Sequence, residues 1–395
     1  MPHRPLFSAA AVLWPIAGIW WFLRLRGGQA TLLPASAMHG LLMSLGVMPL
    51  FIAGFALTTL PRWLGLPATP AQGRALWLPA AGICLAWCLL LLADGLGLRL
   101  AAALAAWLVG LLLAGLALRL LMLCGSPAAR FSPHAWGLSA GLAWIALSQM
   151  LAALAIGLDH LLLLQIAARL GLCFGVAGVF ALALQRLTPF LHLQGRRAPL
   201  LFAALLAGLA LRGGLEIAAL SDWRPSAGLA GLGALGFAAL ALLLWRDARR
   251  PELAAARRTP LVAQLYIGYL WLGLSFALEA WAQALAALGL GAELGPGLAP
   301  LHALSLGFMG STLLAMVSRV SAVQQGRSVA VDAWLWVLQA LLQALTLLRL
   351  LGAIWPAAAG SLLTYAAAGF ALVGFGWAGR YLPWLLRRPG RRMPP

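Results

Sequence analysis

Long apolar runs alternate with short polar segments along the whole chain. Each run holds about 20 residues, the length that an α-helix needs to cross the hydrocarbon core of a bilayer. Glycine, proline and arginine mark the gaps between the runs. The pattern predicts twelve membrane-spanning helices, at residues 7–24, 38–60, 76–93, 100–123, 135–157, 163–185, 198–218, 227–245, 262–288, 300–318, 333–352 and 361–382.

The composition supports a membrane protein. Of the 395 residues, 63% are hydrophobic and 9% are charged, which lies far outside the range of soluble domains. No stretch is long and polar enough for a soluble domain, so we expect an all-α protein with one transmembrane domain over residues 1–395. The net charge of +18 comes from arginine alone. Because arginines mostly fall between apolar runs, they predict contact with lipid headgroups and no binding of nucleic acid.

The distribution of arginine predicts the orientation. An N-terminus in the cytoplasm places 20 arginines inside and 7 outside, as the positive-inside rule requires. Both termini are therefore expected in the cytoplasm. The first run ends well before the cleavage-like Ala35-Ser36-Ala37, so we interpret it as an uncleaved anchor. The outside set is Arg24, Arg26, Arg99, Arg169, Arg212, Arg224 and Arg349.

Two spans open on a histidine and then repeat a short phrase. His39 precedes Ser44-Leu45-Gly46-Val47-Met48, and His302 precedes Ser305-Leu306-Gly307-Phe308-Met309. Both histidines enter from the outer side and are expected at a similar depth. Two neutral imidazoles from two helices can take the two axial positions of a haem iron. The alternative is a pair of interfacial histidines, each hydrogen-bonded to a carbonyl or a headgroup.

Several other side chains are weaker candidates. Met43 lies four residues after His39 and Met309 seven after His302, so both are expected on the histidine faces, as metal ligands or as packing residues. Glu279 lies within the ninth span, where a carboxylate serves a proton relay or pairs with an arginine. Arg62 and Arg319 close the two histidine helices at the cytoplasmic side, where they act most simply as topology anchors. His160 lies beside Asp159 and is either a third outer ligand or a solvated loop residue.

Two motifs carry a resemblance to a known family. The first is Met38-His39-Gly40-Leu41-Leu42-Met43, followed by Gly54-Phe55-Ala56-Leu57-Thr58-Thr59-Leu60-Pro61-Arg62-Trp63. The second is His302-Ala303-Leu304 with Gly307, Gly310, Arg319 and Gly326-Arg327. In these motifs the chain resembles the NnrS family of haem- and copper-containing bacterial membrane proteins. The resemblance covers nearly the whole chain and implies a place in the bacterial inner membrane.

The chain departs from the family pattern at several candidate ligands. Leu41 and Leu42 stand where the pattern has a second histidine and a glutamate, and Tyr266 and Gln324 stand where further histidines are expected. Aliphatic side chains offer no ligand atom, and tyrosine or glutamine binds copper poorly. The resemblance therefore implies haem b at His39 and His302 more strongly than copper.

An analogy of fold points the same way. Haem-copper oxidases also have twelve core helices and hold their low-spin haem between histidines of the second and tenth. The analogy predicts a similar helix bundle and licenses no oxidase activity.

The family resemblance implies a role in nitric oxide metabolism, in the response to nitrosative stress or in denitrification, with nitric oxide and an electron donor as partners. No motif implies that the protein is an enzyme. An enzymatic activity would take the form of a haem-dependent redox reaction. Two alternatives belong to other classes. One is a secondary transporter, which would have a midplane polar site on broken helices, and the other is an accessory membrane protein that holds no cofactor.

Overall fold

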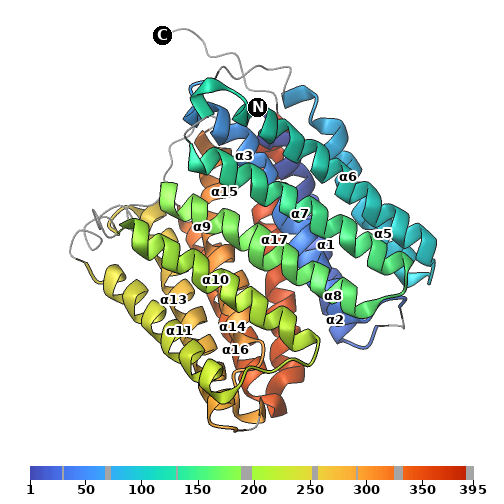
Figure 1. Ribbon diagram of the computed structural model, residues 1–395. Coiled ribbons are helices and arrows are strands. Elements are labelled where there is room, and N and C mark those ends of the chain that lie inside the picture. The colour runs from blue at the N-terminus through green and yellow to red at the C-terminus, as the bar shows by residue number, and fades with distance from the viewer. Residues whose placement is uncertain are drawn as a thin grey trace.

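The computed structural model describes residues 1–28, 31–66, 73–129, 132–187, 198–250, 257–290, 292–323 and 332–387. These residues are almost entirely helical and contain no strand, which confirms the all-α class (Figure 1). Twelve helical segments are long and apolar enough to cross a membrane. Their boundaries lie within a few residues of the predicted spans.

Nine of these spans are single helices. They are α1 (His3–Leu25), α5 (Trp77–Gly95), α6 (Arg99–Cys124), α7 (Pro133–Gly157), α10 (Ala198–Leu220), α11 (Ala227–Ala248), α13 (Pro260–Ala287), α16 (Ala333–Ile354) and α17 (Ala359–Leu386). The polar residues between the apolar runs start several of them. Ser132, Ser226 and Asp332 are N-caps whose side-chain oxygens accept a backbone N–H from the first turn of α7, α11 and α16. Such caps satisfy donors that a helix start leaves unpaired.

Spans two, six and ten are each interrupted by a π-helical segment. Span two consists of α2 (Ala35–Leu41), η1 (Leu42–Val47) and α3 (Met48–Trp63). Span six consists of α8 (Leu161–Leu170), η3 (Gly171–Val176) and α9 (Ala177–Leu187). Span ten consists of α14 (Ala299–His302), η6 (Ala303–Gly310) and α15 (Ser311–Val323). The phrase that spans two and ten share in sequence thus lies largely in their π-helical segments. Turns with i→i+5 hydrogen bonds are rare and concentrate at functional sites. The space between these three segments is therefore a candidate functional site.

Two of the three interrupted spans, spans two and ten, are the most buried of the twelve. Of the residues in the apolar stretch of each span, 83% are buried in spans two and ten, 61% in span six, and 28% in α10 and α11. The first and last spans pack together, and Arg4 Nε donates a hydrogen bond to the carbonyl oxygen of Leu385 at 2.7 Å. The two ends of the described chain therefore lie at one end of the bundle, and spans two, six and ten begin at the other (Figure 1).

Leucines cover the outside of the bundle. Leu78 is 83% exposed and Leu100 is 73% exposed, and many other large apolar side chains share this outward position. In water so much exposed apolar surface would be unfavourable, whereas lipid tails accept it. The protein is therefore a multi-pass membrane protein whose outer surface contacts the bilayer.

Candidate functional site

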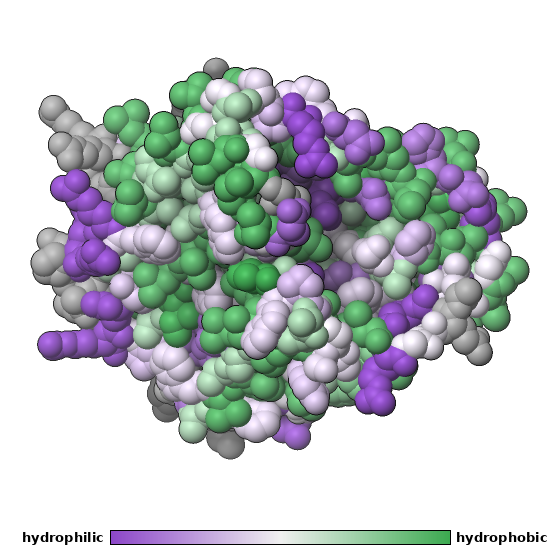
Figure 2. Space-filling view, turned by 90° about the horizontal axis from the view of Figure 1, so that it is seen from below, coloured by the Kyte–Doolittle hydropathy of each residue, from purple (hydrophilic) through white to green (hydrophobic). Residues whose placement is uncertain are grey.

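A central cavity opens between the three interrupted spans. Its volume is about 280 Å³, and its walls come from spans one, two, six, ten, eleven and twelve, with Leu220 of α10. Seen from the end at which spans two and ten begin, the protein is hollowed near its centre, and hydrophilic residues gather in the hollow (Figure 2). The cavity wall carries His39, His302, Arg169, Arg349 and Gln165 among mainly apolar side chains. The two histidines selected from the sequence therefore face one shared space.

His302 is held by its own helix. Its Nδ1 lies 2.9 Å from the carbonyl oxygen of Leu298, one turn earlier. A carbonyl only accepts hydrogen bonds, so Nδ1 carries the proton and Nε2 keeps its lone pair. Metal-binding histidines characteristically donate the distal N–H to a carbonyl in this way, which fixes the tautomer and the direction of the ring. His302 thus lies on the cavity wall with a fixed tautomer and an unprotonated Nε2.

His39 is held by an aromatic ring. The indole of Trp21 stacks on its imidazole with ring centres 4.1 Å apart and planes inclined by 22°. Nδ1 of His39 is buried and has no hydrogen-bond partner among the residues that the structure describes. An unpaired polar atom in such a place is costly unless a ligand engages the ring. The imidazole therefore has a fixed orientation and a ring nitrogen that remains able to bind a ligand.

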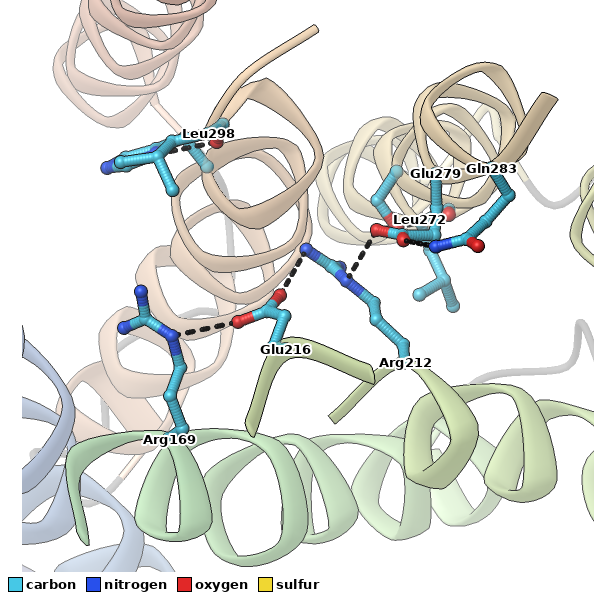
Figure 3. A network of polar contacts seen from close by, with 9 residues as sticks. Arg169, Arg212, Glu216, Leu272, Glu279, Gln283 and Leu298 are labelled. Atoms are coloured by element: carbon cyan, nitrogen blue, oxygen red, sulfur yellow. Dashed lines mark hydrogen bonds and ion pairs between the residues drawn. The ribbon is translucent and has the colours of Figure 1, made fainter. Parts of the chain in front are cut away.

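A chain of ion pairs runs from the cavity into the bundle (Figure 3). Nε of Arg169 lies 3.0 Å from Glu216 Oε2, and the other oxygen of Glu216 lies 3.1 Å from Nη2 of Arg212. Nε of Arg212 lies 3.4 Å from Glu279 Oε2, and Gln283 donates a hydrogen bond to Glu279 at 3.1 Å. Arg212 is only 1% exposed. The chain balances two positive with two negative groups, so its charges compensate one another inside the membrane.

The intramembrane carboxylate predicted in span nine therefore pairs with an arginine. Glu279 is 7% exposed and contacts Arg212 rather than lipid. The sequence does not identify its partner, because Arg169 and Arg212 contribute to the sequence prediction only as arginines on the outer side. The signal was present, since both fall within the predicted spans, where a charged side chain is rare and marks function. Arg349, another member of that set, lies within α16 and lines the cavity.

The two methionines have different positions. Met43 lines the cavity together with His39, as its i,i+4 spacing predicts. Met309 is fully buried and is not part of the cavity wall, although regular α-helical spacing would place it on the face of His302. The reason is the π-helical segment Ala303–Gly310 between the two residues. Its wider turn changes the period of 3.6 residues on which the expectation relied.

The remaining sequence candidates lie away from the cavity. Arg62 is near the end of α3 and Arg319 near the end of α15, and both are exposed. His160 is the N-cap of α8, where its Nδ1 accepts the backbone N–H of Leu163 at 3.2 Å. It is therefore a capping residue and not a third ligand of the cavity. Gln324 lies outside the described residues.

The donor set of the cavity fits a prosthetic group that brings most of its own ligands. Within the described ranges, no group of three or more His, Cys, Asp or Glu side chains converges as a metal site. A haem iron already has four ring nitrogens and needs only two axial ligands from the protein. The free Nε2 of His302 and the unpaired imidazole of His39 supply donors of that type.

Taken together, the fold and the cavity define a twelve-span helical membrane protein with two inward-facing histidines on its inner helices. A comparison with family models agrees: the model described as NnrS protein matches residues 1–388. The chain belongs to the NnrS family. A search of curated proteins finds no match to it.

Proposed function

We propose that this protein binds haem b in the central cavity, where His39 and His302 would hold the iron, and acts in the response to nitric oxide in the bacterial inner membrane. The observation that carries the proposal is the pair of histidines on one cavity wall, one with a fixed tautomer and the other with an unpaired ring. Membership of the NnrS family supports the link to nitric oxide, because the family resemblance implies that role.

The surrounding residues have definable tasks in this proposal. The carbonyl of Leu298 orients His302, and the indole of Trp21 orients His39. Apolar side chains such as Leu172, Leu306 and Phe370 line the cavity and limit water. When bound, haem supplies one-electron redox chemistry and an iron that nitric oxide can bind. Preorganised ligands of this kind lose little entropy on binding, which favours retention of the group.

A reduced-minus-oxidised optical spectrum of the purified protein, with a haem assay, tests the proposal. The variants are His39→Ala and His302→Ala, each expressed in haem-replete cells. We expect sharp low-spin bands with one haem per chain in the wild type. Either substitution should abolish the low-spin spectrum, because each removes one of the two residues that would hold the iron.

His160→Asn is the matched control. It removes an imidazole at the same end of the bundle but keeps a side chain that caps α8. Its spectrum should equal that of the wild type. A colourless wild-type protein would overturn the haem proposal and favour the transporter or accessory function. Copper is measured in the same samples, because Met43 lies on the wall beside His39.

Nitric oxide titration of the same preparation tests the second part. Nitric oxide should change the spectrum of the reduced protein, because haem, when bound, would supply an iron that nitric oxide can bind. Of the two residues that would hold the iron, His39 is expected to be the weaker, because in the described part of the chain its ring is held by stacking on Trp21, whereas His302 has a backbone hydrogen bond. A spectrum that does not respond to nitric oxide would restrict the proposal to electron transfer.

A further inference from the structure

The cavity contains a positive charge that no carboxylate of the described residues compensates. Arg349 of α16 lines the cavity, as do His39 and His302. Among the described residues, no Asp or Glu lies within ion-pair distance of its guanidinium, and no hydrogen bond to it is formed. An unpaired guanidinium within a membrane span is costly. Arg349 is partly buried and lines the cavity, so a ligand in the cavity can reach its guanidinium and compensate the charge.

The neighbouring charges cannot provide that partner. The two carboxylates of the ion-pair network are Glu216 and Glu279, and they already pair with Arg169 and Arg212. The four ion-paired side chains of this network are neutral as a group, so Arg349 adds one net positive charge to the cavity region. Electroneutrality in a low-dielectric site thus favours an anionic ligand.

The geometry of the second cavity arginine adds to this charge. Arg169 uses its Nε edge to contact Glu216, and its two terminal nitrogens point away from that carboxylate (Figure 3). Since Arg169 also lines the cavity, those nitrogens remain available to a ligand. Guanidinium groups bind planar oxyanions through two parallel N–H···O contacts, which adds geometric selectivity to the charge.

We propose that Arg349, with Arg169 as the second guanidinium, forms a carboxylate-type oxyanion site in the cavity of the two histidines. The oxyanion has two sources with the same chemistry. One is a carboxylate of the prosthetic group itself, and this source rests on the proposed function. The other is a small free oxyanion such as nitrite, and this source does not.

The first arm of the test compares haem b with haem b dimethyl ester, which lacks both carboxylates. Each is titrated into full-length protein that was purified from haem-deficient cells. The wild type should bind the acid form at least about tenfold more tightly than the ester, the ratio expected for loss of a charge-assisted hydrogen bond. In Arg349→Leu the ratio should fall to about one, and Arg349→Lys should give an intermediate ratio because it keeps the charge but loses the bidentate geometry.

The second arm needs no haem. The melting temperature of the detergent-solubilised protein is measured with sodium nitrite and with sodium formate, against sodium chloride at equal ionic strength. A free oxyanion that binds the folded state should raise the melting temperature of the wild type and not that of Arg349→Leu. Arg224→Leu is the control for both arms, because Arg224 is exposed on the same side of the bundle and outside the cavity.

The outcomes separate the two sources and the two proposals. A loss of acid-over-ester preference in Arg349→Leu assigns the site to the prosthetic group. Stabilisation by nitrite or formate that depends on Arg349 assigns it to a free oxyanion, even in a wild-type protein that binds no haem. The oxyanion site is overturned when the wild type shows neither an acid-over-ester preference nor oxyanion stabilisation. That judgement uses wild-type protein alone, so it holds even if Arg349→Leu fails to fold.

Discussion

The ring of His39 lies against the indole of Trp21, with their centres 4.1 Å apart. Because no hydrogen bond from the described residues fixes His39, this stacking is what sets the direction of the imidazole. Trp21→Leu should therefore weaken haem binding about two- to tenfold, the equivalent of an aromatic contact worth about 0.5–1.5 kcal/mol. Haem titration of the purified variant measures the effect. Trp336→Leu, at a partly exposed position outside the cavity wall, should bind like the wild type.

The buried pair of Arg212 and Glu279 predicts a large effect on stability. Arg212→Met leaves Glu279 without its arginine and should cost about 3–5 kcal/mol, the usual penalty for breaking a buried pair. Thermal unfolding in mild detergent measures this cost. Adding Glu279→Gln should restore part of the stability, because the orphaned charge is removed, and the double-mutant cycle gives the coupling.

An exposed ion pair provides the contrast. Arg99 contacts Asp159, whose side chain is 71% exposed. Asp159→Asn should change stability by less than about 1 kcal/mol, since water and salt screen the pair. An equal loss of unfolding free energy in Asp159→Asn and Arg212→Met would contradict the larger contribution to stability that is assigned to the buried ion pair.

The pair of Asp332 and Arg380 predicts a dependence on pH. The Arg380 guanidinium, 2.9 Å away through Nη1, lowers the pKa of Asp332 below its usual value. Because the folded pKa is below the unfolded pKa of about 3.9, the ionised pair stabilises the protein at neutral pH. This contribution is lost as the pH falls below about 4 and through the folded pKa.

Asp332→Asn isolates this charge effect, because asparagine is also a good N-cap for α16. Above pH 5 the variant should be less stable than the wild type by under about 1 kcal/mol, as expected for an exposed pair. At pH 3 the difference should shrink. Denaturation curves at the two pH values measure it, and a difference that grows on acidification would contradict the assignment.

Much of the fold was predictable because the bilayer sets the length of an apolar run. The sixth span was expected at residues 163–185 and is observed from Leu161 to Leu187. The pairing of His39 with His302 in one cavity was predictable for another reason, since both begin repeated phrases at the same side. Hydropathy and repetition are local signals, and they sufficed for these features.

The rest of the site depends on signals that local patterns lack. The position of Met309 could not be predicted, because a π-helical segment changes the helical period and hydropathy does not report it. The chain from Arg169 to Glu279 joins spans six, seven and nine. Hydropathy identifies each span but not its neighbours. The place of Arg349 in the cavity likewise required the packing of span eleven against span ten.

The π-helical segment of span ten makes a last prediction about packing. Gly307 lies against the indole of Trp271, and a Cβ at position 307 would come within 2.5 Å of that ring. Trp271 cannot easily retreat, because its Nε1 donates a hydrogen bond to Gln343 at 2.5 Å. Gly307→Ala should therefore cost about 1–3 kcal/mol by overpacking.

Gly178→Ala is the matched control, since nothing lies within 4 Å of a Cβ at that helical position of span six. It should be neutral or stabilise the protein by up to about 1 kcal/mol, because alanine has the higher helix propensity. Thermal unfolding in detergent compares the two variants. If both changed stability equally, the close approach of Trp271 would not be what requires glycine in the repeated phrase. If only Gly307→Ala destabilises the protein and also lowers haem retention, the packing of the π-helical segment helps to position His302.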